Sequence, residues 1–276
     1  MTDDNVKIPF RLKLIDFASR TILKPVYKVY EKWLWYQIKD GPIPKHVAVI
    51  PDGNRRWAKR LGLEVWSGHK FGYVKIKEVL KWCWELGIRT VTVYALSTEN
   101  IMKRSKRELE ELFQVIRRGF KELLESEHIH KHKVHVKVIG RLHLLPEDIR
   151  EYAKKVEDET KDYTNHYLII ALGYGGRQEI VDAVRRLTKD VLERKLSVES
   201  IDEETFSKYL YTGDIPYQDP DLIIRTSGEE RLSGFLLWQS AYSELYFCEA
   251  YWPEFRKIDF WRAIRSYQKR ERRFGK

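Results

Sequence analysis

Residues 46–57 of the chain read His-Val-Ala-Val-Ile-Pro-Asp-Gly-Asn-Arg-Arg-Trp. Within them, residues 47–50 form a short apolar run of the kind found in buried strands of parallel sheets, and Pro51 ends this run. Asp52 therefore stands directly at the carboxyl end of the predicted strand. A carboxylate in this place, followed at once by a glycine and two arginines, suits an anion that is bound together with a metal ion.

The residues after this strand favour a bound phosphate. Gly53 has no Cβ and lets the backbone approach a ligand closely. A helix that begins at Asn54 would direct free N–H groups and the positive end of its dipole at the anion. Arg55 and Arg56 add charge that can pair with phosphate oxygens. The alternative is an ordinary strand-to-helix turn in which Asp52 only caps the helix, and the segment alone leaves both interpretations open.

The composition allows an enclosed site and favours anionic partners. A chain of 276 residues with 43% hydrophobic residues can bury a substantial core. The formal net charge is +10, and residues 256–276 alone carry nine Lys or Arg against two Asp or Glu. Such an excess favours nucleic acid, anionic lipid or diphosphates as partners.

Cysteine content and hydropathy predict a cytoplasmic protein. Cys83 and Cys248 are the only cysteines, they form no Cys-x-x-Cys pair, and no apolar run is long enough to span a bilayer or to act as a signal segment. A group of histidines alternates with other residues between lysines: His128, His130, His132 and His135. A zinc site is conceivable there, but this pattern is more typical of a solvated loop that leads into a strand.

Helical patterns and short β-branched runs alternate after the first strand. Strands are predicted at residues 90–95, 134–139, 167–172 and 221–224, and helices at residues 69–86, 105–126, 146–161, 176–193 and 203–210. No internal repeat and no linker rich in Pro, Gly or Ser is present. We therefore expect a single α/β domain with a central, mostly parallel β-sheet covered by helices.

Polar residues follow each predicted strand directly. The five segments are residues 52–54, 97–100, 140–141, 173–177 and 225–228. In open α/β sheets, ligands bind beyond the carboxyl ends of the strands. Any one segment could be a simple turn, but five together predict a binding site at this edge.

The first 45 residues have a different pattern. Aromatic and aliphatic residues recur at helical spacing between lysines and arginines, and Pro25 is expected to separate two helices. A basic amphipathic segment of this kind can lie in a membrane interface, which would make the protein a peripheral one. It can equally pack on the surface of the domain itself, and the two interpretations are compatible.

Five ordered motifs resemble those of the cis-prenyltransferases, the enzymes that make undecaprenyl and dehydrodolichyl diphosphates. They occupy residues 46–58, 68–69, 94–100, 174–177 and 221–247. The resemblance spans most of the chain and indicates an archaeal-like, single-subunit member. It implies a catalytic domain at residues 46–276 after a helical segment at residues 1–45, with an apolar tunnel between sheet and helices.

The implied reaction is cis-prenyl chain elongation. Isopentenyl diphosphate would be condensed repeatedly onto an allylic diphosphate, farnesyl or geranylgeranyl, to give a long-chain polyprenyl diphosphate. This product would be the precursor of a glycosyl carrier lipid. The tail of the chain favours geranylgeranyl diphosphate as the starter.

The resemblance also implies roles for individual residues. The allylic diphosphate would be bound by Gly53, Asn54, Arg55, Arg56, Trp57, His69 and Arg104. Isopentenyl diphosphate would be bound by Arg225, Arg231, Ser233, Arg273 and Gly275. The metal would be Mg²⁺, held by Asp52 and by Glu244, the latter from a partner subunit. Mg²⁺ prefers few carboxylates together with phosphate oxygens and water, which fits this sparse supply.

Catalysis would involve Asp52, Ser97 and Asn100, the last two where the isopentenyl unit loses its proton. Helix capping for the segment that starts near Ser105 is the alternative role for Ser97 and Asn100, and their distance from that segment makes it the less expected one. No side chain nearby is an obvious strong base, so a diphosphate oxygen is a candidate proton acceptor.

The chain departs from the family pattern at two places. Val65 stands where many bacterial relatives have an arginine. Arg104 lies one residue further from Asn100 than the usual arginine, which leaves open the side chain that takes its part. Residues 273–275, Arg-Phe-Gly, resemble the Arg-x-Gly tail of eukaryotic and archaeal members. Because Asp52 and this tail occur in one chain, the resemblance implies a self-sufficient homodimer in which each tail completes the neighbouring site.

Three other classes of protein compete with this interpretation. A nucleic-acid-binding protein would accord with the pI of 9.3, but the chain has no RRM, zinc-finger or helix-turn-helix signature. A non-catalytic regulatory subunit of a prenyltransferase complex would be expected to lack Asp52. A nucleotide-binding α/β enzyme should show a Gly-x-Gly-x-x-Gly turn, and residues 173–176 lack that spacing. We therefore expect an enzyme without a nucleic-acid partner.

Overall fold

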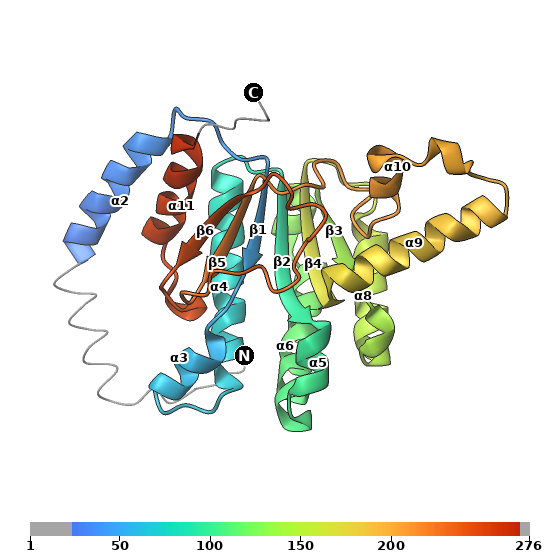
Figure 1. Cartoon of the computed structure of the whole chain (residues 1–276). Coiled ribbons are helices and arrows are strands. Elements are labelled where there is room, and N and C mark those ends of the chain that lie inside the picture. Colours follow the sequence, from blue (N-terminus) through green and yellow to red (C-terminus); the bar gives the residue numbers. More distant parts are fainter. Residues whose placement is uncertain (1–23, 271–276) are drawn as a thin grey trace.

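The predicted parallel sheet is present and has one more strand than expected. The computed structural model describes residues 24–270. Its strands are all parallel and lie in the order β3-β4-β2-β1-β5-β6 (Figure 1). Their bounds are β1 (His46–Ile50), β2 (Thr90–Ser97), β3 (Val134–Ile139), β4 (His166–Tyr174), β5 (Leu222–Thr226) and β6 (Glu244–Cys248). The single α/β domain predicted from the sequence is confirmed.

Helices pack on both sides of this sheet. They are α2 (Lys24–Ile38), α3 (Asn54–Arg60), α4 (Ser67–Glu85), α5 (Thr98–Lys103), α6 (Lys106–Leu124), α7 (Glu127–Lys131), α8 (Glu147–Thr160), α9 (Gly176–Leu192), α10 (Glu203–Lys208) and α11 (Lys257–Lys269). The larger core lies between one face of the sheet and α4, α6, α8 and α11. A smaller core lies on the opposite face, under the segment at residues 211–236.

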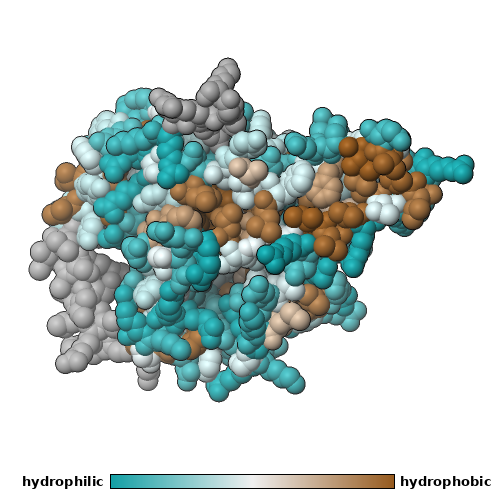
Figure 2. All heavy atoms as spheres, in the orientation of Figure 1, coloured by the Kyte–Doolittle hydropathy of each residue, from teal (hydrophilic) through white to brown (hydrophobic). Residues whose placement is uncertain are grey.

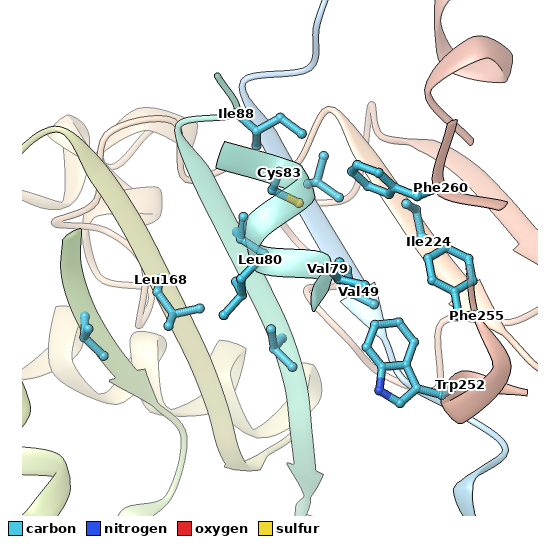
Figure 3. Packing of buried hydrophobic residues seen from close by; sticks show 14 of the residues in the cluster. Val49, Val79, Leu80, Cys83, Ile88, Leu168, Ile224, Trp252, Phe255 and Phe260 are labelled. Atoms are coloured by element: carbon cyan, nitrogen blue, oxygen red, sulfur yellow. The ribbon is translucent and has the colours of Figure 1, made fainter. Parts of the chain in front are cut away.

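Strand β1 explains why its sequence is a continuous apolar run. Val47 and Val49 belong to the larger core, whereas Ala48 and Ile50 belong to the smaller one. Successive side chains of a strand point to opposite faces, and a central parallel strand is buried on both of them. Figure 3 shows Val49 beside Val79 of α4 in the larger core.

Four helices or strands were not predicted. Helix α7 lies within the histidine-rich segment, where a solvated loop was expected. Helix α5 has six residues, too few for a clear apolar period. Strand β6 lies at the edge of the sheet and is only half-buried along its length, so its sequence lacks a strong alternation. The segment that forms α11 was seen only as a basic tail, but one face of this helix is buried, with Phe260, Trp261 and Ile264 in the larger core.

Helix α2 joins the N-terminal segment to the core. Pro25 lies in its first turn, where the missing N–H removes no helical hydrogen bond. Leu34 and Ile38 are completely buried, and α2 packs along α11. The helix expected before Pro25 lies outside the described residues. Between residues 24 and 270, no helix is both long enough and apolar enough to cross a membrane.

The register of β1 and β5 brings two predicted site segments together. Ile50 pairs with Arg225, so Asp52 and Arg225 leave the sheet at the same edge. The hydroxyl of Thr226 donates a hydrogen bond to the backbone carbonyl of Asp52 at 2.8 Å. The strand exits thus meet where the sequence predicted a site.

Candidate active site

A cavity of about 930 Å³ extends from the carboxyl edge of the sheet into the space between the sheet, α4 and α6. Its lining is polar at the strand ends and mostly apolar further in, where Lys77, Lys81, Glu122 and His128 also take part. The polar part includes Asp52, Asn54, Arg55, Arg56, His69, Arg104, Arg225 and Ser233. The apolar part includes Leu112, Ile116, Phe120, Leu123, Leu168 and Ile170. Most of the residues predicted to bind diphosphates therefore share one cavity.

Asp52 is held by guanidinium groups and does not cap α3. Its Oδ2 accepts a hydrogen bond from Nη2 of Arg225 at 2.8 Å and lies 3.5 Å from Nη2 of Arg56. Its Oδ1 accepts from the N–H of Gly53 at 2.6 Å. Gly53 is the residue at the N-terminal cap of α3, and that helix has no side-chain cap. The simple helix-cap alternative for Asp52 is thus not what the structure contains.

Glycines allow the polar segment to approach its neighbours closely. Gly53 has a φ of 95°, and a Cβ there would lie 2.6 Å from Cδ1 of Tyr251. A Cβ on Gly68 of α4 would lie 2.1 Å from the backbone oxygen of Asn54. The start of α4 therefore rests directly on the start of α3, and this contact brings His69, the next residue, to the cavity.

Arg225 connects Asp52 with the segment that follows β5. The Arg225 residue is only 4% exposed, and its Nη1 donates to Oγ of Ser233 at 2.9 Å and to the backbone carbonyl of Arg231. The Arg231 side chain is not part of the cavity lining and pairs with Glu229. The structure thus brings Arg225 and Ser233 to the cavity, while Arg231 contributes only its backbone oxygen to the cluster.

A buried carboxylate that sequence reasoning missed lies behind the other basic residues. Oε1 of Glu108 is 3.2 Å from Nε of Arg55, 3.3 Å from Nε2 of His69 and 3.5 Å from Nε of Arg104. Burial lowers the pKa of His69, whereas its hydrogen bond to Glu108 raises it. The same hydrogen bond lowers the pKa of Glu108. The available signal was the Ser-x-x-Glu spacing that begins at Ser105, which is typical of a helix start.

Ser97 and Asn100 line the cavity and also begin a helix. Oγ of Ser97 accepts a hydrogen bond from the N–H of Asn100 at 3.0 Å and so caps α5. Ser105, not Ser97, caps the following helix α6. The capping role judged less expected for Ser97 is therefore real, although it serves a helix that was not predicted.

Other predicted site residues lie away from this cluster. Trp57 is 8% exposed and packs on Phe71 with ring centroids 4.8 Å apart, so it fills the contact between α3 and α4 and does not line the cavity. Glu244 begins β6 at the opposite, amino edge of the sheet, where it accepts a hydrogen bond from Arg270. It cannot reach Asp52 of its own chain. Arg273 and Gly275 lie outside the described residues.

The donor set fits a magnesium ion that takes most of its ligands from a substrate. Asp52 offers one carboxylate among guanidinium groups, and Oδ1 of Asn54 is buried nearby without a hydrogen-bond partner. In the described part of the chain, no group of three or more His, Cys, Asp or Glu side chains could hold a metal alone. Mg²⁺ commonly binds through one or two carboxylates and completes its shell with phosphate oxygens and water.

A carboxylate and several guanidinium groups at the head of a cavity with apolar walls are the arrangement expected of an enzyme that acts on an anionic group attached to an apolar chain. Comparison with known families narrows this class. The chain belongs to the cis-prenyltransferases: a family model described as "Putative undecaprenyl diphosphate synthase" matches residues 50–275. It is a single-subunit enzyme of the archaeal type, a transferase that elongates prenyl diphosphates in the cis configuration.

Curated relatives and solved structures agree with this family. A tritrans,polycis-undecaprenyl-diphosphate synthase (geranylgeranyl-diphosphate specific) from Methanopyrus kandleri is 59% identical over 259 residues, 94% of each chain. The enzyme from Sulfolobus acidocaldarius with the same specificity in its name is 54% identical over 260 residues, 94% of this chain and 98% of that one.

Lavandulyl diphosphate synthase from Lavandula x intermedia, solved with dimethylallyl diphosphate, superposes with a TM-score of 0.80 at 36% identity and covers 85% of this chain and 99% of its own. A probable undecaprenyl diphosphate synthase from Campylobacter jejuni gives 0.68 at 35% identity, covering 85% and 100%. These likenesses favour neither a nucleic-acid-binding protein nor a non-catalytic subunit.

Proposed function

We propose that this enzyme adds isopentenyl diphosphate repeatedly to geranylgeranyl diphosphate and makes a long-chain polyprenyl diphosphate, the precursor of a glycosyl carrier lipid. The observation that carries the proposal is the contact between Asp52 and Arg225 at the head of the cavity. It brings a metal-binding carboxylate and a diphosphate-binding guanidinium within one hydrogen bond of each other. The names of the archaeal relatives support geranylgeranyl diphosphate as the starter.

The allylic diphosphate would lie over the start of α3. Its oxygens would accept hydrogen bonds from the backbone at Gly53 and Asn54 and from the guanidinium groups of Arg55, Arg56 and Arg104, with His69 beside them. Asp52 would hold Mg²⁺, which supplies positive charge for the leaving diphosphate. These groups stabilise negative charge as the allylic C–O bond breaks, so electrostatics and not a covalent nucleophile would carry the reaction.

The isopentenyl diphosphate would lie beside it, at Arg225 and Ser233. These two side chains already form a hydrogen bond of 2.9 Å, which orients the guanidinium towards the cavity. Ser97 and Asn100 line the same space and would stand where C2 of the isopentenyl unit loses its proton. Because their hydroxyl and amide groups are weak bases, a diphosphate oxygen remains our candidate for the acceptor.

The apolar part of the cavity would hold the growing chain as a tunnel. Each five-carbon unit that becomes fully buried would gain on the order of 4 kcal/mol, taken from about 0.8 kcal/mol per carbon. Such burial keeps the intermediate bound between successive additions. It also keeps water away from the allylic cation at the cavity head.

The starter is tested by the products formed from each allylic diphosphate. With radiolabelled isopentenyl diphosphate, kcat/KM should be about tenfold or more higher with geranylgeranyl than with farnesyl diphosphate, since the longer chain fills more apolar surface. Chromatography of the dephosphorylated products gives both the rate and the chain length. Equal use of farnesyl diphosphate would refute the starter assignment, and no product from either would refute the proposed function.

The protein would act as a homodimer. Several large apolar side chains of and near α9 are exposed: Val181, Val184, Leu192, Val198 and Ile201. Figure 2 shows brown, hydrophobic surface at the end of the molecule where α9 and α10 lie. A second copy of the chain would cover such a surface. A dimer would also give Glu244 a metal site to reach, the one in the neighbouring subunit.

A membrane surface would be a further partner, through α2. Val26, Val29, Trp33 and Tyr36 are exposed along one side of this helix, between 48% and 70% of each residue. Arg265 of α11 lies 5.7 Å from the ring of Trp33. Apolar and aromatic side chains flanked by cationic ones are typical of helices that lie in an anionic interface. The long-chain product also needs a bilayer to receive it.

Two matched substitutions test this contact. Val29→Glu on α2 should lower the partition of the protein onto phosphatidylglycerol vesicles about tenfold, because it removes apolar burial and adds a repelled charge. Val74→Glu on α4, at a residue that is 51% exposed against 70% for Val29, should leave partition unchanged. Sedimentation with vesicles measures both. An equal effect of the two substitutions would contradict a specific role for α2.

A further inference from the structure

Glu108 is a buried carboxylate that does not line the cavity. It lies in the first turn of α6, and its backbone N–H donates to Oγ of Ser105 at 3.2 Å. The residue is 6% exposed and is absent from the cavity lining, whereas Arg55, His69 and Arg104 all line the cavity. A carboxylate is seldom buried unless it is paired, so its partners should explain its place.

Its partners come from three separate elements and meet at a single oxygen. Oε1 contacts Arg55 from α3, His69 from α4 and Arg104 from the end of α5, all within 3.5 Å. The three partners are themselves close together, with Nη1 of Arg104 only 3.3 Å from Nε2 of His69. Without the carboxylate, the guanidinium groups of Arg55 and Arg104 and the imidazole of His69 would face one another. The side chains of His69 and Arg104 are largely buried, whereas that of Arg55 is 53% exposed.

These contacts leave terminal nitrogens of both arginines for a diphosphate. Arg55 contacts Glu108 through Nε, so its terminal Nη groups are not committed to this carboxylate. Nε of Arg104 lies 3.5 Å from the same oxygen without a hydrogen bond, and its Nη1 contacts Nε2 of His69, which leaves Nη2. An arginine whose place is fixed by a neighbouring carboxylate can present its remaining N–H groups to a phosphate. Glu108 therefore contacts the arginines on the side that faces away from the cavity and orients their remaining N–H groups towards it.

We propose that Glu108 is a positioning residue for the allylic diphosphate: it holds Arg55, His69 and Arg104 in one arrangement before substrate arrives. This inference rests on the proposed function of those three residues in binding that diphosphate. A preorganised cluster binds better because less side-chain entropy is lost and less repulsion is overcome during binding. Arg225 and Ser233 do not contact Glu108, so the isopentenyl diphosphate subsite should not depend on it.

The test is Glu108→Gln, which keeps the size of the side chain and the backbone cap but removes the charge. The dissociation constant for geranylgeranyl diphosphate alone should rise about ten- to a hundredfold, the range for a lost hydrogen bond to a charged group. The KM for isopentenyl diphosphate should change less than twofold. Glu108→Asp, which keeps the charge on a shorter side chain, should recover most of the affinity. Calorimetry and steady-state kinetics give the two quantities.

Glu111→Gln is the matched control, because Glu111 lies on the same helix and pairs with Lys70 of α4 outside the cavity lining. It should leave both quantities unchanged. Wild-type or tighter binding of geranylgeranyl diphosphate by Glu108→Gln would overturn the inference, as would equal losses for both substrates. If Glu108→Gln does not fold, Glu108→Asp and Arg104→Gln are compared instead. The inference is overturned if Glu108→Asp binds geranylgeranyl diphosphate no better than Arg104→Gln does. A wild-type protein that does not bind geranylgeranyl diphosphate would refute the proposed function itself.

Discussion

Substitution of Asp52 by alanine should lower kcat by roughly 10³-fold or more while the fold is preserved. The change removes the carboxylate that would hold Mg²⁺ against the leaving diphosphate. It also frees Arg225, which donates to Oδ2 of Asp52 at 2.8 Å, and Arg56 at 3.5 Å. Single-turnover incorporation of radiolabelled isopentenyl diphosphate measures the chemical step separately from slow product release.

Two further variants separate charge from structure. Asp52→Asn retains an oxygen that can accept the hydrogen bond from the N–H of Gly53, so a comparable loss of rate would assign the effect to the negative charge. Asp162→Ala, in the exposed loop between α8 and β4, is a neutral control for the loss of one surface carboxylate. Asp52→Ala should cost about 1–2 kcal/mol of unfolding free energy at most. If Asp52→Ala retained more than a tenth of the wild-type activity, the assignment of Asp52 as the metal-binding catalytic carboxylate would be refuted.

Substitution of Arg225 by glutamine should lower kcat/KM for isopentenyl diphosphate about 10³-fold, with much less change in the affinity for the allylic substrate. Arg225 is the one described guanidinium that is both almost fully buried and hydrogen-bonded to Ser233 at the cavity head. Replacement of a buried, oriented guanidinium by a neutral side chain leaves the bound diphosphate without its main partner. Loss of one partner of such a buried charge pair typically costs about 2–5 kcal/mol of binding free energy or more. Initial rates at varied isopentenyl diphosphate give the value.

The nature of the replacement is informative at this position. Arg225→Lys should recover little, since an ammonium group cannot contact Ser233, Asp52 and a diphosphate with the same geometry. Arg89→Gln is the control at the amino edge of the sheet, where Arg89 donates to the backbone oxygen of Asn165. An unchanged KM for isopentenyl diphosphate in Arg225→Gln would place that subsite elsewhere in the cavity.

The sequence predicted the elements whose residues are buried in a regular pattern. Strand β3 has the predicted bounds, and β1, β2, β4 and β5 differ from the predictions by at most two residues at either end. The apolar, β-branched runs of β1, β2, β4 and β5 reflect burial on both faces of the sheet, whereas the alternation in β3 reflects an edge strand with one buried face. Strand β6 was not predicted because it is half-buried at every position and therefore shows no alternation of apolar and polar residues, unlike the other edge strand, β3. Helix α11 was not predicted because its many basic residues were interpreted as a charged tail, although one face of the helix, which includes Phe260 and Trp261, is buried.

The candidate site was predicted where chemistry follows a strand end and missed where it depends on packing. Asp52, Arg225 and Ser233 meet because parallel strands end at one edge. Trp57 was assigned to the diphosphate through the family resemblance, and in this structure its ring packs on Phe71. Glu108 was missed because burial of a charged residue on a highly charged helix leaves no periodic signal. The part assigned to Glu244 depends on a second chain, which one sequence cannot position.

The pairing of Ile50 with Arg225 fixes the distance between the ends of β1 and β5, where the proposed site lies. If the allylic diphosphate lies at Gly53 and the isopentenyl diphosphate at Arg225, their spacing would be set largely by the backbone ladder of adjacent strands, which lie about 4.8 Å apart. Each round of addition should therefore meet the same distance between its reacting carbons, whatever the length of the chain already made. Growth would alter only the contents of the apolar end, so an early and a late cycle should proceed at the same intrinsic speed until that space is full.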